Sequence, residues 1–301
     1  MRHWKITVAQ GAWSLALLAV LAVSYQFFFV KFNPQDLRSV QKWFILLDYD
    51  QENSSVDFNR IKEFEMAVLD PDQHLPLEHF QKGAFLIAYL SLGEAEDYRF
   101  YWNNIKKQSW VLNKNPNWEG NYYVDVRSQQ WQELVMNHLI PKIIEKGFRG
   151  IMLDTVDTAA MLEQANPGKY LGMREAMVDL IKNIHEKYPQ LLLLTNNGFE
   201  LLSEVAPFLS GLVVEDVYQM IDFKAGGYTA VPESDREWKL GILRNIQRKF
   251  SLPVFCIDYA DEDERESVSS LHLKIKKLGF KPYIAEGFLS RIYNQELILN
   301  Q

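Results

Sequence analysis

Hydrophobic runs of strand length recur along the chain from residue 43 onward and alternate with longer segments whose apolar residues have helical spacing. Short, continuous apolar runs are typical of parallel strands that are buried on both faces. We therefore expect strands over nine segments: Trp43–Tyr49, Met66–Asp70, Ala84–Leu92, Tyr122–Val126, Gly150–Thr155, Leu191–Thr195, Leu212–Glu215, Val254–Asp258 and Pro282–Ala285.

Amphipathic segments between these runs predict helices. The first is expected over Gln130–Lys146, where Ser128 is a suitable N-cap and Gly147 a suitable stop. Three more are expected over Tyr170–Lys187, Asp235–Phe250 and Glu264–Leu278, each followed closely by proline or glycine. This alternation of strands and helices predicts a parallel α/β fold.

A (β/α)8 TIM barrel needs eight parallel strands, one fewer than the nine candidates. The surplus segment is either Tyr122–Val126 or the terminal Pro282–Ala285. A doubly wound sheet is the alternative, but no GxGxxG follows the first strand and the chain has no Walker-type loop. Because no linker or low-complexity stretch interrupts residues 33–301, we expect them to form a single barrel domain.

Residues 1–32 have the pattern of an export segment. Arg2 and Lys5 precede an uncharged run over Gly11–Val30, and about 20 apolar residues suffice to span a bilayer. Ala22 and Ser24 would suit a signal peptidase, so cleavage and secretion are the alternative. The length of the run favours an uncleaved anchor, and the positive-inside rule then places the barrel outside the membrane, facing the periplasm or the cell exterior.

Composition narrows the function classes further. The net charge of −7 is unlike that of a nucleic-acid-binding protein, which usually carries a basic face. Cys256 is the only cysteine, so no intrachain disulfide can form. It lies in an apolar run with no histidine nearby, which favours a small buried side chain over a nucleophilic thiol.

Acidic residues follow six of the predicted strands at the point where the apolar run stops. In a barrel these positions meet at the carboxyl-terminal face, where active sites are built. Any one of them could instead cap a helix or lie favourably beside a helix dipole. The convergence of six strand ends favours a functional site, formed from Asp48, Asp50, Asp70, Glu94, Asp154, Asp157, Glu215, Asp216 and Asp258.

Other hydrolytic chemistries fit the sequence less well. None of the six histidines ends a strand, and HxH, HExxH and GxSxG motifs are absent from the sequence. Paired carboxylates are the apparatus of glycoside hydrolysis, which needs no cofactor or metal. Hard cations accept all-oxygen sites, so a metal-dependent hydrolase stays open as an alternative. Asn196 and Asn197 suit either hydroxyl binding or an Asn-Gly turn.

Four motifs carry a family resemblance that spans roughly residues 43–285: YLSLGEAEDYRFYW (89–102), GFRGIMLDTVDT (147–158), NNGFELL (196–202) and VVEDVYQ (213–219). Together they resemble the GH114 family of endo-α-1,4-polygalactosaminidases, which are TIM barrels. The resemblance implies cleavage of a galactosamine-containing polysaccharide through one Asp and one Glu.

Transferred by motif, the resemblance implies Asp154 and Glu215 as the catalytic pair, with Asp157 as the alternative Asp. We assign Glu215 as general acid/base and Asp154 as nucleophile. The expected substrate-binding residues are Asp48, Glu94, Tyr98, Asn197, Tyr218, Asp258 and Tyr259. A non-catalytic, cell-surface glycan-binding barrel that uses the same aromatic side chains is the competing hypothesis.

Overall fold

The structure of the protein is a computed structural model, in which residues 37–50 and 56–293 are described. The expected anchor over residues 1–32 lies outside the described residues and stays a prediction. In the described part of the chain, none of the helices combines the length and the apolar character that crossing a bilayer requires.

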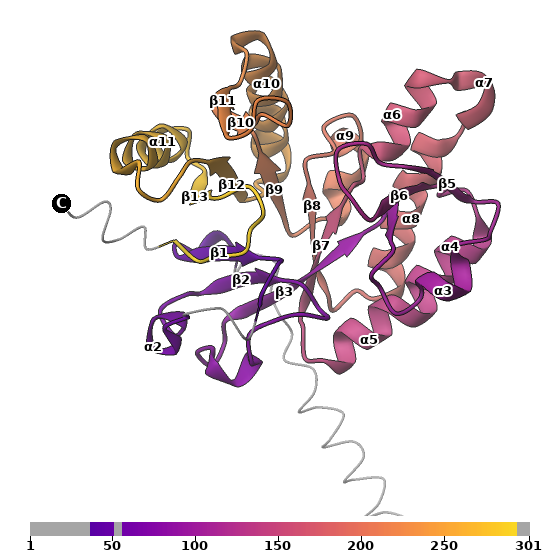
Figure 1. The fold of residues 1–301 in the computed structure, drawn as a ribbon, viewed down its shortest axis with the longest axis horizontal. Helices are drawn as coiled ribbons and strands as arrows, with labels where there is room; N and C mark the ends of the chain where they lie inside the picture. The colour runs from indigo at the N-terminus through magenta and orange to yellow at the C-terminus, as the bar shows by residue number, and fades with distance from the viewer. Residues whose placement is uncertain (1–36, 51–55, 294–301) are drawn as a thin grey trace, which may run out of the picture.

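Eight parallel strands form one sheet that curls into a nearly closed barrel with helices on its outside (Figure 1). This arrangement confirms the predicted (β/α)8 fold. In their spatial order the strands are β1 (Trp43–Leu46), β2 (Met66–Leu69), β3 (Phe85–Ser91), β7 (Gly150–Asp154), β8 (Leu192–Asn196), β9 (Gly211–Glu215), β12 (Val254–Tyr259) and β13 (Lys281–Ala285).

The surplus strand candidate was Tyr122–Val126. It forms β6 (Asn121–Val124), which pairs antiparallel with β4 (Glu94–Glu96) and β5 (Val111–Lys114) in a small separate sheet. This sheet is inserted between β3 and β7 of the barrel. The terminal candidate Pro282–Ala285 is the barrel strand β13.

Helices cover the outer face of the sheet. The first of them, α2, covers Phe58–Ile61 and α3 covers Trp102–Ile105. The remaining helices are α4 (Gln129–Leu134), α5 (Ile140–Glu145), α6 (Thr158–Ala165), α7 (Pro167–Tyr170), α8 (Met173–Lys187), α9 (Leu202–Val205), α10 (Glu233–Phe250) and α11 (Arg265–Lys277). The expected helices over Asp235–Phe250 and Glu264–Leu278 therefore match α10 and α11 to within two residues at each end.

Two helix predictions need correction. The expected helix over Gln130–Lys146 is divided into α4, a π-helical turn over Val135–Leu139, and α5. Pro141 lies in the first turn of α5 and has no N–H to donate, so the regular hydrogen-bond ladder breaks there. The expected Tyr170–Lys187 helix begins only at Met173, because the preceding Gly172 adopts a left-handed conformation with φ of 84°.

The barrel interior is apolar at one end and polar at the other. Near the amino ends of the strands, the Trp43 ring contacts Phe255 and Tyr283, with ring centroids 5.2 and 5.6 Å apart. The Trp43 indole N–H also donates to the Lys281 carbonyl across the gap between β1 and β13. Side chains alternate along each strand, so inward-facing positions continue to the carboxyl ends, where they become polar.

Gly93, just after β3, allows close packing against the turn that follows β7. A Cβ atom at Gly93 would lie 2.2 Å from the Thr155 carbonyl oxygen. We expect Gly93→Ala to lower the free energy of unfolding by about 1–3 kcal/mol, because the turn must move to accommodate it. Chemical denaturation followed by circular dichroism measures this loss.

Gly241, within α10, provides the matched control. A Cβ atom there meets no atom within 4 Å. Because alanine favours helices more than glycine, Gly241→Ala should raise the free energy of unfolding by up to about 1 kcal/mol. Similar stabilities of the two variants would contradict the close approach at Gly93.

Candidate active site

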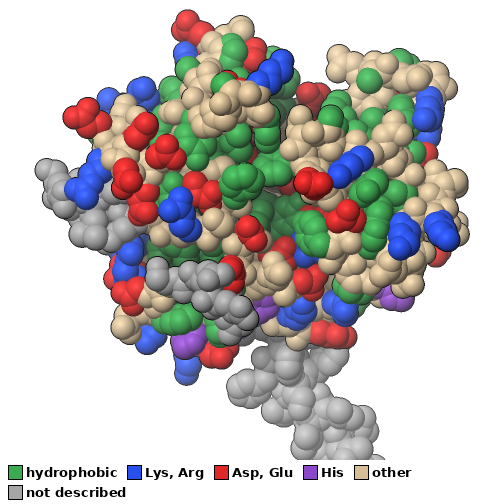
Figure 2. Space-filling view, in the orientation of Figure 1, with side chains coloured by type: hydrophobic (Ala, Val, Ile, Leu, Met, Phe, Trp, Pro, Cys, Tyr) green, Lys and Arg blue, Asp and Glu red, His purple; other side chains and the backbone are tan. Residues whose placement is uncertain are grey.

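A cleft of about 670 Å³ opens over the carboxyl ends of the barrel strands. Figure 2 shows acidic and hydrophobic side chains around the hollow on this face. Among the described residues, the cleft lining includes no Lys, Arg or His side chain. It includes seven carboxylic acids: Asp48, Asp70, Glu94, Glu96, Asp154, Asp157 and Glu215.

Three neighbouring strands bring polar side chains together on the floor of this cleft. Asp154 ends β7, Asn196 ends β8 and Glu215 ends β9. The Asn196 amide nitrogen donates to Asp154 Oδ1 at 2.9 Å and to Glu215 Oε1 at 2.7 Å. Since 2.9 Å plus 2.7 Å is 5.6 Å, the two carboxylate oxygens can be no more than 5.6 Å apart.

The backbone turns sharply after each of these three residues. Thr155, Asn197 and Asp216 follow them directly and have positive φ angles of 57°, 49° and 58°. Residues other than glycine rarely adopt this conformation, and strained backbone of this kind clusters at functional sites. The Lys239 ammonium on α10 supports the last turn by donating to the Glu215 and Asp216 carbonyls, at 3.1 and 2.8 Å.

The environment of Glu215 suits a group that donates a proton. Burial raises the pKa of its carboxyl to about 7, and the charges of Asp216 and Asp154 act in the same direction. The Tyr259 hydroxyl donates to Oε2 of Glu215, and this bond with that of Asn196 partly opposes the rise. A carboxyl with such a pKa is still partly protonated at neutral pH, as a general acid must be.

Asp154 and Asp157 differ in their surroundings. Burial raises the pKa of Asp154, while hydrogen bonds from Asn196, the Thr155 backbone and Tyr89 favour its ionised form. Asp157 is exposed and precedes α6, and its carboxyl makes no capping bond to that helix. Partial desolvation and the nearby charge of Asp154 raise the pKa of Asp157. Asp154 is therefore the Asp that Asn196 links to Glu215.

Comparison with known proteins places the chain in a family. Residues 30–297 match the model of glycoside-hydrolase family GH114. The chain belongs to this family. It is also 28% identical to a Thermotoga maritima protein described as uncharacterized. The alignment of 306 residues covers 91% of this chain and 90% of that relative.

Two solved structures share the fold of this GH114 chain. The glycoside hydrolase domain of PelA from Pseudomonas aeruginosa is 24% identical, with a TM-score of 0.71 over 84% of this chain and 97% of that domain. The complex of Aspergillus fumigatus Ega3 with galactosamine is 17% identical, with a TM-score of 0.59 over 84% of this chain and 93% of that one. Both likenesses support the barrel architecture of the GH114 chain.

In this GH114 barrel, Glu94 anchors the inserted sheet to the cleft wall. Its buried carboxylate accepts hydrogen bonds from Asn115 and Asn121, both at 2.9 Å, and from Thr158 at 3.3 Å. Burial raises its pKa, although these three bonds favour the ionised form. Glu94 lines the cleft, as expected of a substrate-binding residue, but its oxygens already have protein donors.

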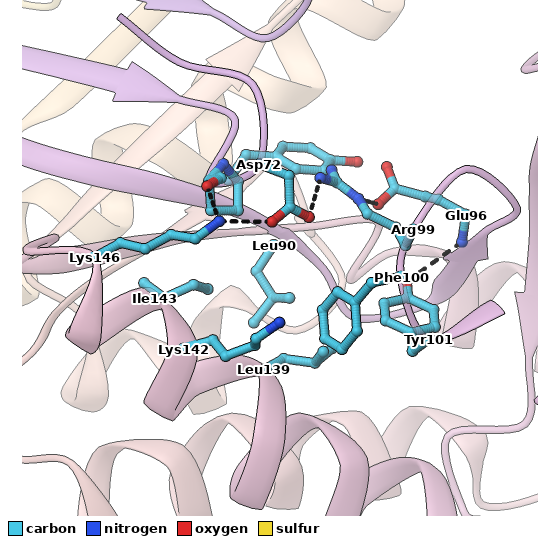
Figure 3. A pocket seen from close by; sticks show the side chains of 12 residues that line it. Asp72, Leu90, Glu96, Arg99, Phe100, Tyr101, Leu139, Lys142, Ile143 and Lys146 are labelled. Atoms are coloured by element: carbon cyan, nitrogen blue, oxygen red, sulfur yellow. Dashed lines mark hydrogen bonds and ion pairs between the residues drawn. The ribbon is translucent and has the colours of Figure 1, made fainter. Parts of the chain in front are cut away.

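A buried ion network supports the same wall from behind. The Arg99 guanidinium contacts Asp70 at 2.6 Å, Glu96 at 2.7 Å and Asp72 at 3.2 Å. Figure 3 shows Arg99 between Asp72 and Glu96, with Lys146 bound to the other side of Asp72 at 2.7 Å. Buried carboxylates need such pairing, so Arg99 holds two of the cleft acids, Asp70 and Glu96, in place.

Two expected substrate-binding residues, Asp258 and Tyr218, lie outside the cleft lining. Asp258 is fully buried, and its carboxylate accepts backbone hydrogen bonds from Val217, at 2.8 Å, and Tyr218. Burial raises its pKa to about 7. It therefore fixes the loop after β9 instead of facing substrate. The Arg236 guanidinium lies over the Tyr218 ring, with its central carbon 5.4 Å from the centroid of the ring.

The other expected residues are brought together at the cleft. Asp48 and Tyr98 are exposed and line it, and Tyr98 donates to Glu96 at 2.6 Å. Asn197 also lines it, while its side-chain oxygen accepts the Glu215 backbone N–H at 3.0 Å. Tyr259 is buried beneath the cleft floor with its hydroxyl on Glu215.

Sequence reasoning missed two residues of the floor. Asn196 was noted only as a turn or hydroxyl-binding residue, whereas it bridges Asp154 and Glu215. Tyr89 was placed in a strand without a role, yet it lines the cleft and bonds Asp154. The alternation of side chains along β3 was the available signal, because Tyr89 lies two residues before Ser91, which pairs with Asp154.

The structure also shows the surroundings of the single cysteine and the arrangement of possible metal ligands in the described part of the chain. Cys256 is fully buried, which confirms the expected packing role, and burial raises its thiol pKa well above the ordinary value. No group of three or more His, Cys, Asp or Glu side chains among the described residues is arranged to hold a metal ion.

Proposed function

We propose that this GH114 barrel hydrolyses a galactosamine-containing polysaccharide with retention of anomeric configuration. The observation that carries the proposal is the Asn196 amide, which bonds both Asp154 and Glu215 and keeps Asp154 Oδ1 and Glu215 Oε1 within 5.6 Å of each other. Retaining glycosidases have carboxyl groups about 5–5.5 Å apart, whereas inverting enzymes have about 6.5–9.5 Å to accommodate a water molecule. The spacing therefore supports direct attack by one carboxylate.

In the first step, the Asp154 carboxylate attacks the anomeric carbon and forms a glycosyl ester. The glycosidic C–O bond breaks at the same time, and Glu215 gives its proton to the departing oxygen. The raised pKa of Glu215, caused chiefly by burial, suits this donation. The hydrogen bonds from Asn196, the Thr155 backbone and Tyr89 suit an ionised nucleophile at Asp154.

In the second step, Glu215 is a carboxylate and acts as general base. It takes a proton from a water molecule, whose oxygen attacks the anomeric carbon and releases Asp154 as a carboxylate. The Tyr259 hydroxyl and the Asn196 amide both donate to Glu215, so they stabilise the charge it carries between the two steps. Each group thus returns to its starting protonation state.

The charge of the cleft supports an amino sugar as substrate. Its lining has seven carboxylic acids and, among the described residues, no basic side chain. Such a cleft favours a cationic polymer, and galactosamine units without acetyl groups carry ammonium groups at neutral pH. The solved Ega3 complex contains galactosamine, which agrees with this substrate class.

The test is incubation of the full chain with a partly deacetylated α-1,4-linked galactosamine polymer. We expect new reducing ends, and proton NMR of the first product should show the α-anomer before mutarotation. Initial release of the β-anomer would overturn the retaining mechanism. An absence of new reducing ends with every amino-sugar polymer tried would overturn the proposed activity itself.

A further inference from the structure

Exposed hydrophobic side chains gather around the cleft. Tyr98, Trp118, Met161 and Phe288 line it, and each is at least 40% exposed. A fifth, Phe223, is 53% exposed and contacts Trp118 edge to face, with ring centroids 5.4 Å apart. Apolar surface left exposed around a polar site indicates a binding surface, and flat rings suit the apolar faces of sugar units.

The Trp118–Phe223 contact joins loops from two sides of the active site. Trp118 lies between β5 and β6 of the inserted sheet, which follows β3. Phe223 lies at the tip of the antiparallel hairpin of β10 (Gln219–Ile221) and β11 (Tyr228–Ala230), which follows β9. Strands β7 and β8, which carry Asp154 and Asn196, stand between β3 and β9 in the sheet (Figure 1).

The contact therefore spans the strand ends that carry the proposed nucleophile. Two rings in edge-to-face contact leave no space for a sugar unit between them. An internal stretch of a long polymer cannot pass sideways between these loops while the rings touch. A chain end, by contrast, can pass beneath them.

We propose that Trp118 and Phe223 form an aromatic clasp that opens to admit an internal stretch of the polysaccharide and closes over it. The proposal rests on the proposed hydrolase function and adds to it which residues determine how a long chain enters. Closed over a chain, the Trp118 ring offers a sugar-binding face inside the cleft that it already lines. Opening needs only movement of two loop tips, because neither ring belongs to the barrel core.

A chemical cross-link tests the clasp. In the double variant Trp118→Cys/Phe223→Cys, a short bis-maleimide joins the two introduced cysteines. The native Cys256 is fully buried and therefore protected from the reagent. We expect the cross-linked enzyme to cleave a long galactosamine polymer about 10-fold or more slowly, because only chain ends can enter a closed clasp. Short oligomers, rich in ends, should be cleaved at nearly the unmodified rate.

The two single-cysteine variants, treated with the same reagent, control for the substitutions and for modification. If the cross-linked enzyme cleaves long polymer as fast as these controls do, the clasp proposal is wrong. Trp118→Ala should raise KM for long polymer several-fold with little change in kcat. Trp238→Ala is the matched control, because Trp238 is also exposed, at 48%, but packs on Phe199 away from the cleft lining.

A binding measurement separates failure of the clasp from failure of the hydrolase function. With Glu215→Gln as background, association of the fluorescently labelled polymer is followed with and without the cross-link. Slower association of the polymer with the cross-linked protein than with the protein without the cross-link supports the clasp, even if the protein hydrolyses no polymer. Equal association rates, together with normal hydrolysis by the wild type, overturn the clasp and leave the hydrolase function intact.

Discussion

Glu215→Gln should lower kcat for polymer hydrolysis by about 10²–10⁴-fold, because the amide can neither donate a proton to the leaving oxygen nor activate water. Polymer binding should be retained, since the glutamine has nearly the same shape. Its oxygen can accept from Asn196, while its NH2 group can donate to the Tyr259 hydroxyl oxygen. Reducing-end assays measure the loss, and equilibrium binding to the immobilised polymer measures what is kept. A correctly folded variant with wild-type turnover would remove Glu215 from the mechanism.

The same variant decides between a hydrolase and a non-catalytic glycan-binding barrel. If wild type and variant bind the polymer equally and neither releases reducing ends, the binding hypothesis is favoured. Thermal unfolding of both proteins serves as the control for folding, because Glu215 lies beside buried partners. A stable variant that binds but does not turn over places the defect in the chemical step.

The pH dependence gives a second readout for Glu215. Its pKa is about 7 because burial and the charges of Asp216 and Asp154 disfavour ionisation. A general acid must be protonated, so kcat/KM should fall as pH rises through about 7. Tyr259→Phe removes a hydrogen bond that favours the ionised form of Glu215. The fall of kcat/KM should therefore move to higher pH in this variant. An unchanged midpoint of this fall would mean that another group controls it.

Much of the site could be predicted from the sequence because barrel topology converts strand ends into neighbours. Asp154 and Glu215 end apolar runs, and parallel strands bring their carboxyl ends to one face. The structural role of Asp258 could not be predicted in this way. Its partners are the backbone N–H groups of Val217 and Tyr218, about 40 residues earlier, and only the folded loop aims them at its carboxylate.

The inserted sheet shows a second limit of sequence patterns. Asn121–Val124 has the length of a strand and forms one. Nothing in its local sequence shows that it pairs antiparallel outside the barrel. Its place follows from contacts at long range, such as the bonds from Asn115 and Asn121 to Glu94. The role of Asn196 could not be predicted for a different reason. An Asn-Gly turn accounts for Asn196 and Asn197 without giving either residue a role in chemistry.

Asp154→Asn and Asp157→Asn form a matched pair that tests the choice of nucleophile. Both remove one negative charge from the same loop without changing the size of the side chain. Asp154→Asn should lower kcat by at least about 10³-fold, because the amide cannot form the glycosyl ester. Asp157→Asn should change kcat by less than about 10-fold, since its exposed carboxyl makes no capping bond to α6 and Asn196 donates to Asp154 instead.

The physical reason for this difference is the shared amide of Asn196. It fixes Asp154 and Glu215 at a separation that suits attack from one side of the sugar and protonation at the other. Labelling with a mechanism-based fluoro-galactosamine, followed by peptide mapping, should place the covalent sugar on Asp154. A label on Asp157, or a larger kinetic loss in Asp157→Asn, would transfer the nucleophile to Asp157 and leave Asp154 as a positioning residue.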